Sequence, residues 1–332
     1  MSLLLLVLGC GGPRTVAVAP AAPVEAPVLR LLLTVEARVD APPVDRGPLH
    51  LWIPVPPTND DQQVVATFAG DVSGVVEDEQ DHGNRFWHGV VPEPDGSPLS
   101  VTARFEVVRR EASADVSAAP LRPLTAAERS ARSRYLAASA RVPVGADDPV
   151  LGPVLADLRV QAGTDAAPVV ARTIYDYVID TMEYKKVGTG WGNGDTYWAC
   201  SAKYGNCTDY HSLFLSLARS EGIPARFEMG LPISTDRDDG KIGGYHCWLQ
   251  FWLPQVGWVP IDASEADKNP AMREAYFGGH GLDRVLFTRG RDLRLGSDHR
   301  GAPLNYLIYP YAEVGGEAYD GVTRDVHYRV LP

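Results

Sequence analysis

The pattern of apolar and polar positions predicts short β-strands over the first third of the chain. Apolar residues alternate at least partly with polar ones in several runs separated by proline, glycine, aspartate and asparagine, namely residues 29–39, 49–53, 63–68, 85–91 and 99–108. Strands of this length and spacing are typical of a β-sandwich. We therefore expect a β-sandwich domain over residues 28–115, of immunoglobulin size but without the Cys-Trp-Cys signature, packed as a scaffold against the remaining chain.

A helical pattern follows the predicted sandwich. Residues 125–128, Thr-Ala-Ala-Glu, have the form of a capping box and predict a helix to about residue 140, and a second helix is predicted after residues 147–149. We interpret residues 116–165 as a helical linker. Apolar positions then recur at helical spacing in residues 168–182, which predicts the first helix of a second domain.

The segment that suggests chemistry in this second domain is residues 204–211, Tyr-Gly-Asn-Cys-Thr-Asp-Tyr-His. After Cys207, apolar residues recur at helical spacing, and Gly222 with the following Ile-Pro supplies a stop signal. Cys207 therefore lies in the first turn of a predicted helix. There the free backbone N–H groups and the positive end of the helix dipole favour the thiolate, and an N–H group can bind a developing oxyanion.

One predicted hairpin downstream supplies a base and an orienting carboxylate. Residues 244–253 alternate as a strand, a turn is predicted at residues 254–257, and the returning strand brings Asp262 close to His246. In a Cys/His/Asp arrangement the imidazole forms an ion pair with the thiolate and protonates the leaving amine, while the carboxylate orients the ring. We predict Cys207, His246 and Asp262 as the catalytic residues. His211 lies near Cys207 on the helix, but no carboxylate partner for it is evident.

These residues, in this order, resemble the transglutaminase-like superfamily, a relative of the papain-like cysteine proteases. The resemblance covers about residues 173–311 and rests on Gly-Asn-Cys-Thr-Asp, Gly-Ile-Pro-Ala-Arg, Gly-Tyr-His-Cys-Trp and Asp-Ala-Ser-Glu-Ala. It implies an α+β catalytic domain, placed here at residues 166–332, in which the helix bearing the cysteine packs on an antiparallel sheet. Strand-like runs at residues 284–287, 305–310 and 325–331 are expected to complete that sheet.

The resemblance also implies a reaction class. The expected function is thiol-dependent amide-bond chemistry on a peptide or protein through a thioester, ending either in hydrolysis by water or in transfer to an amine, as in a transglutaminase. A peptide:N-glycanase-like or cell-wall amidase activity would use the same residues. The competing interpretation is a non-catalytic surface lipoprotein that binds a partner through its β-sandwich.

Smaller features around the cysteine allow more than one interpretation. The glycine-rich residues 188–195 lack the Gly-Lys-Ser/Thr ending of a phosphate loop and are expected to wrap near Cys207. Trp191 or Trp198 could offer an indole N–H to an oxyanion, or either could be a packing residue. Asp209 is expected to favour the dipole at the helix start. Arg226 is expected to pair with a nearby acid.

The first residues of the chain suggest where in the cell the protein is located. The first ten residues are apolar up to Gly9-Cys10 and resemble a bacterial lipoprotein signal, with residues 7–10 as the lipobox and Cys10 as the lipidated residue. Residues 11–27 are rich in alanine, proline and glycine and read as a tether. This predicts an exported cell-envelope protein that contacts the membrane through a lipid anchor only. The alternative is an N-terminal tail without a targeting role.

Charge and metal-ligand patterns narrow the possible partners. A net charge of −11, with both signs mixed along the chain, argues against nucleic-acid binding. The sequence shows no Cys-x-x-Cys pair, histidine-rich tract or calcium loop, so we expect no metal site, no cofactor and metal-independent activity. Cys200 and Cys247 form a disulfide or are small buried residues. The oligomeric state has no signal in the sequence.

Overall fold

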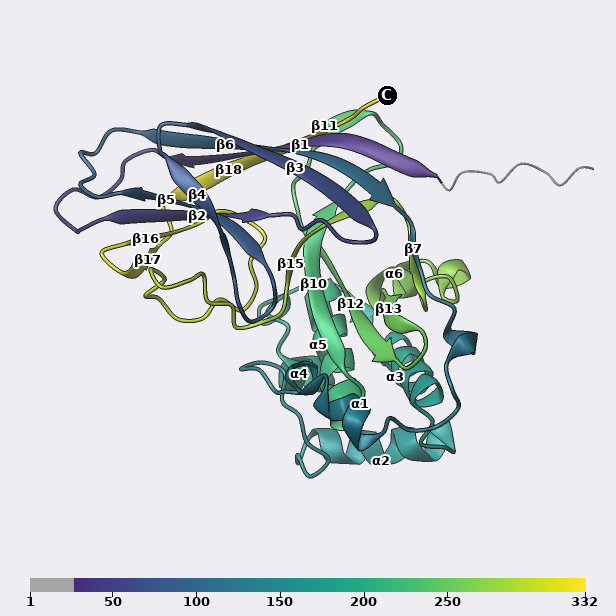
Figure 1. The fold of residues 1–332 in the computed structure, drawn as a ribbon. Helices are drawn as coiled ribbons and strands as arrows, with labels where there is room; N and C mark the ends of the chain where they lie inside the picture. Colours follow the sequence, from purple (N-terminus) through teal and green to yellow (C-terminus); the bar gives the residue numbers. More distant parts are fainter. Residues whose placement is uncertain (1–26) are drawn as a thin grey trace, which may run out of the picture.

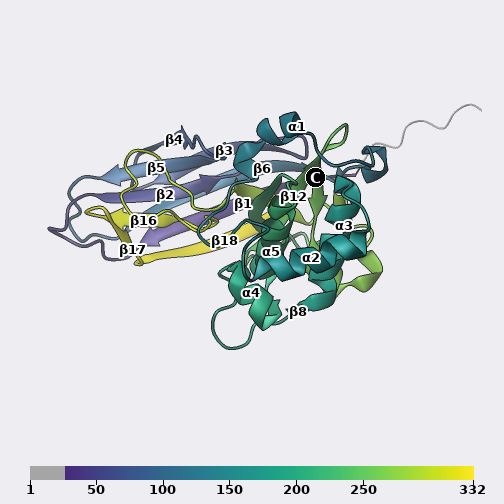
Figure 2. The same cartoon turned by 90° about the horizontal axis from the view of Figure 1, so that it is seen from below.

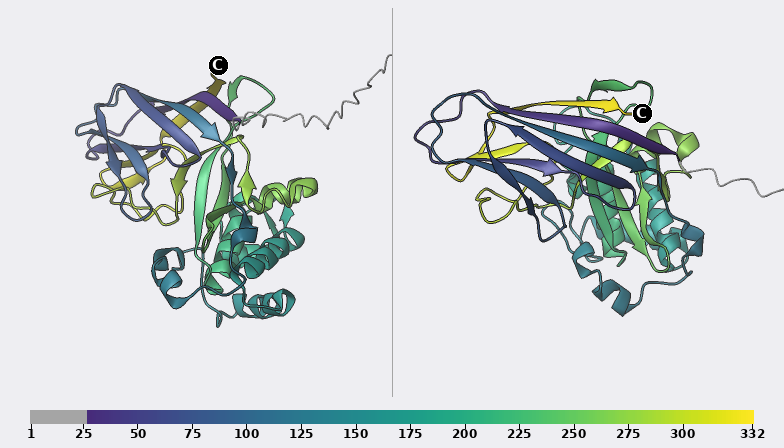
Figure 3. Two further views of the ribbon diagram at one scale, coloured as in Figure 1. Left: turned by 45° about the vertical axis from the view of Figure 1, so that its right-hand side comes forward. Right: turned by 45° about the horizontal axis from the view of Figure 1, so that its top comes forward.

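The structure, a computed structural model, describes residues 27–332. A β-sandwich and a domain of helices on a sheet lie side by side in it (Figures 1 and 3). The predicted α+β class is confirmed. The expected lipoprotein signal and tether, with Cys10, lie outside the described residues apart from Pro27. In the described part of the chain, no helix has the length and apolar character needed to cross a membrane.

The sandwich is made of two five-stranded antiparallel sheets. The strand order is β11-β18-β1-β6-β3 in the first sheet and β17-β16-β2-β5-β4 in the second. The strands are β1 Val28–Val39, β2 Leu49–Val55, β3 Gln62–Gly70, β4 Gly74–Asp78, β5 Arg85–Val91, β6 Leu99–Arg110, β11 Asp239–Lys241, β16 Tyr311–Val314, β17 Glu317–Tyr319 and β18 Val322–Val330.

Alternation along the strands builds the core between these sheets. From Leu31 onward, every second side chain of β1 is buried, and these residues are Leu31, Leu33, Val35, Ala37 and Val39. They join a cluster that includes Phe105 of β6 and Ile53 of β2. Period-two burial of this kind leaves the opposite face of each sheet free to carry other groups.

The C-terminal strands differ from the sequence prediction. Only β15, Arg284–Arg289, joins the sheet of the second domain, whereas β16, β17 and β18 join the sandwich. β18 pairs with β1 from Leu31↔Val330 to Val39↔Val322, and Figure 2 shows the yellow C-terminal strands among the purple and blue N-terminal ones. An alternating pattern fits any sheet with a free edge, so it could not identify the partner strand. The sandwich therefore uses both ends of the described chain.

The second domain packs helices on a four-stranded antiparallel sheet of order β13-β12-β10-β15. Its remaining strands are β10 Ala225–Pro232, β12 His246–Leu253 and β13 Gly257–Ile261, and its helices are α2 Leu151–Ala162, α3 Ala167–Thr181, α4 Thr196–Ala202, α5 Cys207–Ser220 and α6 Ala263–Lys268. Every residue of α5 from Cys207 to Arg219 is buried. This central helix lies behind β10 and β12 in Figure 1.

The connection between the domains is less helical than predicted. The capping box exists, because Thr125 and Glu128 exchange side-chain to backbone hydrogen bonds of 3.2 and 2.8 Å, but helix α1 spans only Ala126–Ser130. None of its residues is buried, and a helix this short is marginal without packing. Beyond the end of α1, the Arg132 guanidinium packs over the Trp252 ring. The shorter elements are β7 Ala112–Ser113, β8 Glu183–Tyr184, β9 Tyr204–Gly205, β14 Gly279–His280 and the 3-10 turns Val116–Ala118, Ser133–Tyr135 and Pro270–Met272.

The pairing of β18 with β1 makes a stability prediction. Val326 faces the sandwich core and is 3% exposed, so Val326→Ala should lower the free energy of unfolding by about 1–3 kcal/mol through lost burial and a residual cavity. Thr323→Ala, an exposed position on the same strand, should change it by less than about 0.5 kcal/mol. Urea denaturation of both variants makes the comparison, and equal effects would contradict the assigned inner face of β18.

Candidate active site

Cys207 lies at the start of α5, as the sequence predicted. Asn206 is the N-cap residue, and its side-chain oxygen accepts a hydrogen bond from the Thr208 N–H at 2.9 Å. Asp209 closes a capping box by accepting the Asn206 N–H at 3.0 Å. The cap fixes the direction in which the chain enters the helix and therefore the position of the Cys207 thiol. This side chain is only 2% exposed.

The structure brings the three predicted catalytic residues together. His246 is the first residue of β12, and Asp262 directly follows β13 as the N-cap of α6. The His246 Nε2 atom lies 2.6 Å from Asp262 Oδ2. The His246 ring also lies close enough to the Cys207 thiol for each group to shift the pKa of the other. The imidazole thus contacts the carboxylate and acts electrostatically on the thiol.

The electrostatics of this group favour an ion pair. Burial opposes ionisation of Cys207, but hydrogen bonds with Cys247 and His246 and the charge on His246 outweigh it and lower the pKa of the thiol well below its usual value. Burial likewise opposes protonation of His246, yet Asp262 and the Cys207 thiolate raise its pKa to about 10. Near neutral pH the site therefore holds a thiolate and an imidazolium.

Asp262 is held by more partners than the sequence indicated. Arg284, which is 1% exposed, places Nη1 2.6 Å from Asp262 Oδ2, and the other carboxylate oxygen accepts bonds from the Ser264 hydroxyl and the Glu265 N–H, both at 3.0 Å. Although burial opposes ionisation, His246 and Arg284 hold the pKa of Asp262 well below its usual range. Sequence reasoning missed Arg284; its one signal was a charged residue opening the apolar run Val-Leu-Phe.

His211 requires a correction. Its Nε2 atom lies 3.6 Å from Asp262 Oδ1, so the expectation that it lacks a carboxylate neighbour is wrong. The packing of α6 against α5 creates this contact, which spacing along the chain could not show. The same nitrogen accepts the Ala263 N–H at 3.2 Å, and burial lowers the pKa of His211. A neutral ring whose Nε2 lone pair is already occupied does not act as the base.

The three cysteines in the described part of the chain are all free thiols. A disulfide between Cys200 and Cys247 is therefore absent, and the alternative of a small buried residue holds for Cys247. Burial and the Cys207 thiolate raise the pKa of Cys247 well above its usual value, and burial raises that of Cys200. Cys247 remains a protonated donor beside Cys207, and only Cys207 has a lowered pKa.

Asp209 does more than favour the helix dipole. Its carboxylate accepts the Gly192 N–H at 2.7 Å and the Gly194 N–H at 3.0 Å, which holds the glycine-rich loop beside the start of α5. The indole of Trp191 donates to the Gly188 carbonyl at 3.1 Å inside this loop, and Trp198 packs beside Gly190. These contacts favour a packing role for both tryptophans.

A cleft with a cavity of about 400 Å³ opens beside His246. Tyr184, Gly244 and Glu265 line it from the catalytic domain, and Tyr328 lines it from β18 of the sandwich. Its further charged residues are Arg237, Lys241, Lys268, Asp283 and Arg284. Arg226 lies outside this lining and pairs with Glu228 at 3.5 Å, as expected.

Comparison with known proteins agrees with this geometry. Residues 156–263 match the sequence model described as the transglutaminase-like superfamily. The segment that carries the candidate site is therefore similar to the transglutaminase-like superfamily. The matched residues include Cys207, His246 and Asp262 and end one residue after the carboxylate. The match to this family model and the buried ion pair together support a thiol-dependent enzyme.

Relatives of this chain are found among sequences and solved structures. An uncharacterized protein of Haemophilus influenzae is 31% identical over 179 residues, 44% of this chain and 48% of that protein. The uncharacterized protein YebA of Bacillus subtilis is 31% identical over 79 residues, 21% of this chain and 11% of YebA. The matches therefore span about half of the first relative and a tenth of the second.

A crystal structure from Cytophaga hutchinsonii, described as a proposed cysteine protease, shares the fold. It superposes with a TM-score of 0.62 over 92% of both chains at 14% identity. The coverage includes the sandwich as well as the transglutaminase-like core. At this identity the likeness shows the fold alone.

The ion pair predicts how Cys207 reactivity depends on pH. A lowered thiol pKa means that the thiolate is present near neutral pH and is lost only as pH falls through that lowered value. In His246→Gln the pKa should return toward about 8.5, so alkylation by iodoacetamide at pH 6 should slow by about a hundredfold. Both rates are measured in a Cys200→Ser background, which removes the half-buried thiol. An unchanged pH profile in His246→Gln would refute the ion pair.

The Arg284–Asp262 contact predicts a large loss of stability. Arg284→Met leaves a buried carboxylate with one cation fewer and should lower the free energy of unfolding at pH 7 by about 3–5 kcal/mol. A carboxyl group whose pKa is lowered by folding stabilises the folded state at pH values above its pKa in the unfolded chain, which is about 4. The stability difference between Arg284→Met and the unmodified protein should therefore shrink as the pH falls below that value. Arg284→Lys, which keeps the charge, should lose less. Urea unfolding at several pH values tests all three statements.

Proposed function

We propose that this chain carries out thiol-dependent amide-bond chemistry on a peptide or protein, with Cys207 as nucleophile, His246 as acid and base, and Asp262 as the residue that orients and charges the imidazole. The observation that carries the proposal is the chain of contacts from Arg284 through Asp262 to His246, whose charge in turn lowers the pKa of the Cys207 thiol. Each member is nearly or fully buried, and each has a defined charge. A structural cysteine would need no such arrangement.

The proposed reaction follows from the position of each group. The Cys207 thiolate attacks the amide carbonyl carbon, and the oxyanion that forms is bound by the Cys207 N–H, which has no acceptor within the helix because it lies in the first turn of α5. His246 then donates its proton to the departing amine or ammonia, leaving a thioester on Cys207. The Thr208 N–H already donates to Asn206.

The second half of the reaction distinguishes a hydrolase from a transferase, and we favour hydrolysis. The cleft beside His246 is lined by Arg237, Lys241 and Lys268 together with Glu265 and Asp283. Charged side chains of both signs keep such a cleft hydrated, and His246 can then activate water toward the thioester. An envelope location for this reaction rests on the lipoprotein-like residues that end at Cys10.

A product assay tests the proposal. Casein is incubated with the protein, with and without a labelled primary amine, and ammonia, new peptide termini and incorporated label are measured. We expect ammonia or new termini without incorporation, and complete loss of product in Cys207→Ala. Cys200→Ala is the matched control and should keep full activity, because that thiol lies outside the triad.

The other outcomes of this assay have defined meanings. Label incorporation that requires Cys207 would identify an amine transferase and overturn the preference for hydrolysis. Equal product from Cys207→Ala would remove Cys207 from the mechanism. Loss of product in the Cys200 control as well would trace the loss to folding rather than to chemistry.

A further inference from the structure

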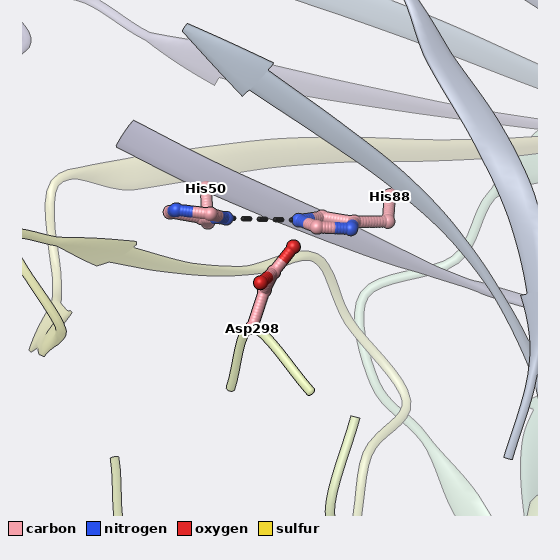
Figure 4. A group of neighbouring side chains, drawn as sticks. All are labelled: His50, His88 and Asp298. Carbon is pink, nitrogen blue, oxygen red and sulfur yellow. Dashed lines mark hydrogen bonds between the residues drawn. The ribbon is translucent and has the colours of Figure 1, made fainter. Parts of the chain in front are cut away.

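A second cluster of polar side chains lies on the outer face of the sandwich. It contains His50 of β2, His88 of β5 and Asp298 of the segment between β15 and β16, each offering one ligand atom within 4.8 Å of the others. His50 Nδ1 and His88 Nε2 are 3.0 Å apart. Figure 4 shows the two rings meeting edge to edge, with the Asp298 carboxylate beside the gap between them.

Strand alternation places both histidines on this face. Leu49, Leu51 and Ile53 of β2 point into the core, so His50 and Trp52 point outward. Trp52 lies directly opposite His88 in the neighbouring strand, and their rings stack at 4.7 Å with an interplanar angle of 3°. The completely buried Trp52 therefore holds the edge of the His88 ring toward His50.

A carboxylate next to His88 fixes which of its ring nitrogens carries the proton. His88 Nδ1 lies 3.3 Å from Glu77 Oε1 on β4, so the proton is assigned to Nδ1 and the Nε2 lone pair faces His50. His88 itself is 5% exposed. Histidines that ligate metals characteristically donate their second ring N–H to a carboxylate in this way, which fixes the tautomer and makes the free nitrogen a better ligand.

A buried glutamate positions the third ligand. Glu313 of β16 lies opposite His50 in register and accepts the backbone N–H groups of Arg300 and Gly301 at 3.0 and 2.9 Å. Because Glu313 is completely buried and its oxygens are occupied by these donors, it anchors the loop and is not itself available as a ligand. The anchored loop presents the exposed carboxylate of Asp298 to the histidines.

The distances suit a tetrahedral ion after small adjustments. A metal about 2.0–2.1 Å from two imidazole nitrogens separates them by roughly 3.3 Å in tetrahedral geometry. The observed 3.0 Å requires a shift of a few tenths of an ångström. Asp298 lies on the surface, where its side chain is free to close the remaining gap. Two imidazoles and a carboxylate form a donor set for zinc and related ions, with water in the fourth position.

We propose that His50, His88 and Asp298 bind a divalent first-row transition-metal ion, with zinc as the best-matched ion, and that this ion ties the segment of residues 290–310 to the second sheet of the sandwich. The proposal departs from the expectation of no metal site, which rested on patterns of nearby ligands; these ligands come from three distant parts of the chain. It is independent of the thiol chemistry, in which the ion takes no part.

The tied segment continues to the candidate active site. Arg291 at one end donates to the Gly194 carbonyl at 3.1 Å, and Tyr306 at the other donates to the Gly192 carbonyl at 3.2 Å. Both acceptors belong to the glycine-rich loop that Asp209 holds beside Cys207. An ion at His50 and His88 would therefore stabilise the same segment that supports this loop.

Metal titration of the full chain, free of any histidine tag and stripped with chelator, tests the site. Calorimetry with zinc should show one site, and cobalt should give the absorption spectrum of a tetrahedral complex. His50→Gln should abolish both signals, and Asp298→Asn should weaken binding at least tenfold. Glu77→Gln should weaken it about 10–100-fold through the lost support of His88. His327→Gln, an exposed histidine elsewhere on the sandwich, should bind as the unmodified protein does.

Thermal unfolding supplies the second measurement. Zinc should raise the melting temperature of the unmodified protein and of His327→Gln, and should leave that of His50→Gln unchanged, because an ion bound only to the folded state stabilises that state. Equal zinc affinity in His50→Gln and the unmodified protein, or no saturable site in a folded unmodified protein, would overturn the proposal. In that case the two histidines form only a hydrogen bond.

Discussion

The buried charge on Asp262 is the constraint on which the candidate site depends. Removing an ionised carboxylate from water is costly unless donors replace the lost hydration. Here those donors come from β12, β15 and α6: His246, Arg284, the Ser264 hydroxyl and the Glu265 N–H. The carboxylate is satisfied only when all three elements are in place. The second domain must therefore be folded for Asp262 to stay ionised, and an ionised Asp262 in turn requires these three elements.

The arrangement of the sheet shows how this requirement is met. β12 and β10 lie between β13, which Asp262 follows, and β15, which begins at Arg284, yet the Arg284 side chain contacts Asp262. Gly230 of β10 pairs with His246, and a Cβ atom there would come within 2.6 Å of the Trp248 ring. The Arg284 guanidinium lies 5.3 Å from the centre of that ring. The absence of a side chain at Gly230 leaves room for Trp248, which in turn supports the arginine.

Local signals predicted the parts of the site that depend on neighbouring residues. The start of α5 at Cys207, the place of Asp209 in its first turn and the hairpin joining His246 to Asp262 all rest on spacing of a few residues, where dihedral preferences and turn chemistry decide the outcome. The parts that were missed come from elements far apart in the sequence. Arg284 reaches Asp262 from another strand, and His211 meets Asp262 because α6 packs on α5. No periodicity encodes such contacts, since any buried strand or helix face would show the same pattern.

The sandwich also shapes the site, which a separate scaffold would not do. β11, Asp239–Lys241, is an edge strand paired with β18, and the Ile242 N–H donates to the Val326 carbonyl at 2.8 Å. Only three residues separate this bond from His246 along the chain. Tyr328 of β18 lines the cleft on the same side. His246 is therefore fixed from its C-terminal side by the sheet of the second domain and from its N-terminal side by the sandwich. Loosening the sandwich should move His246 as well as open the cleft, so both domains determine the geometry around the thiol.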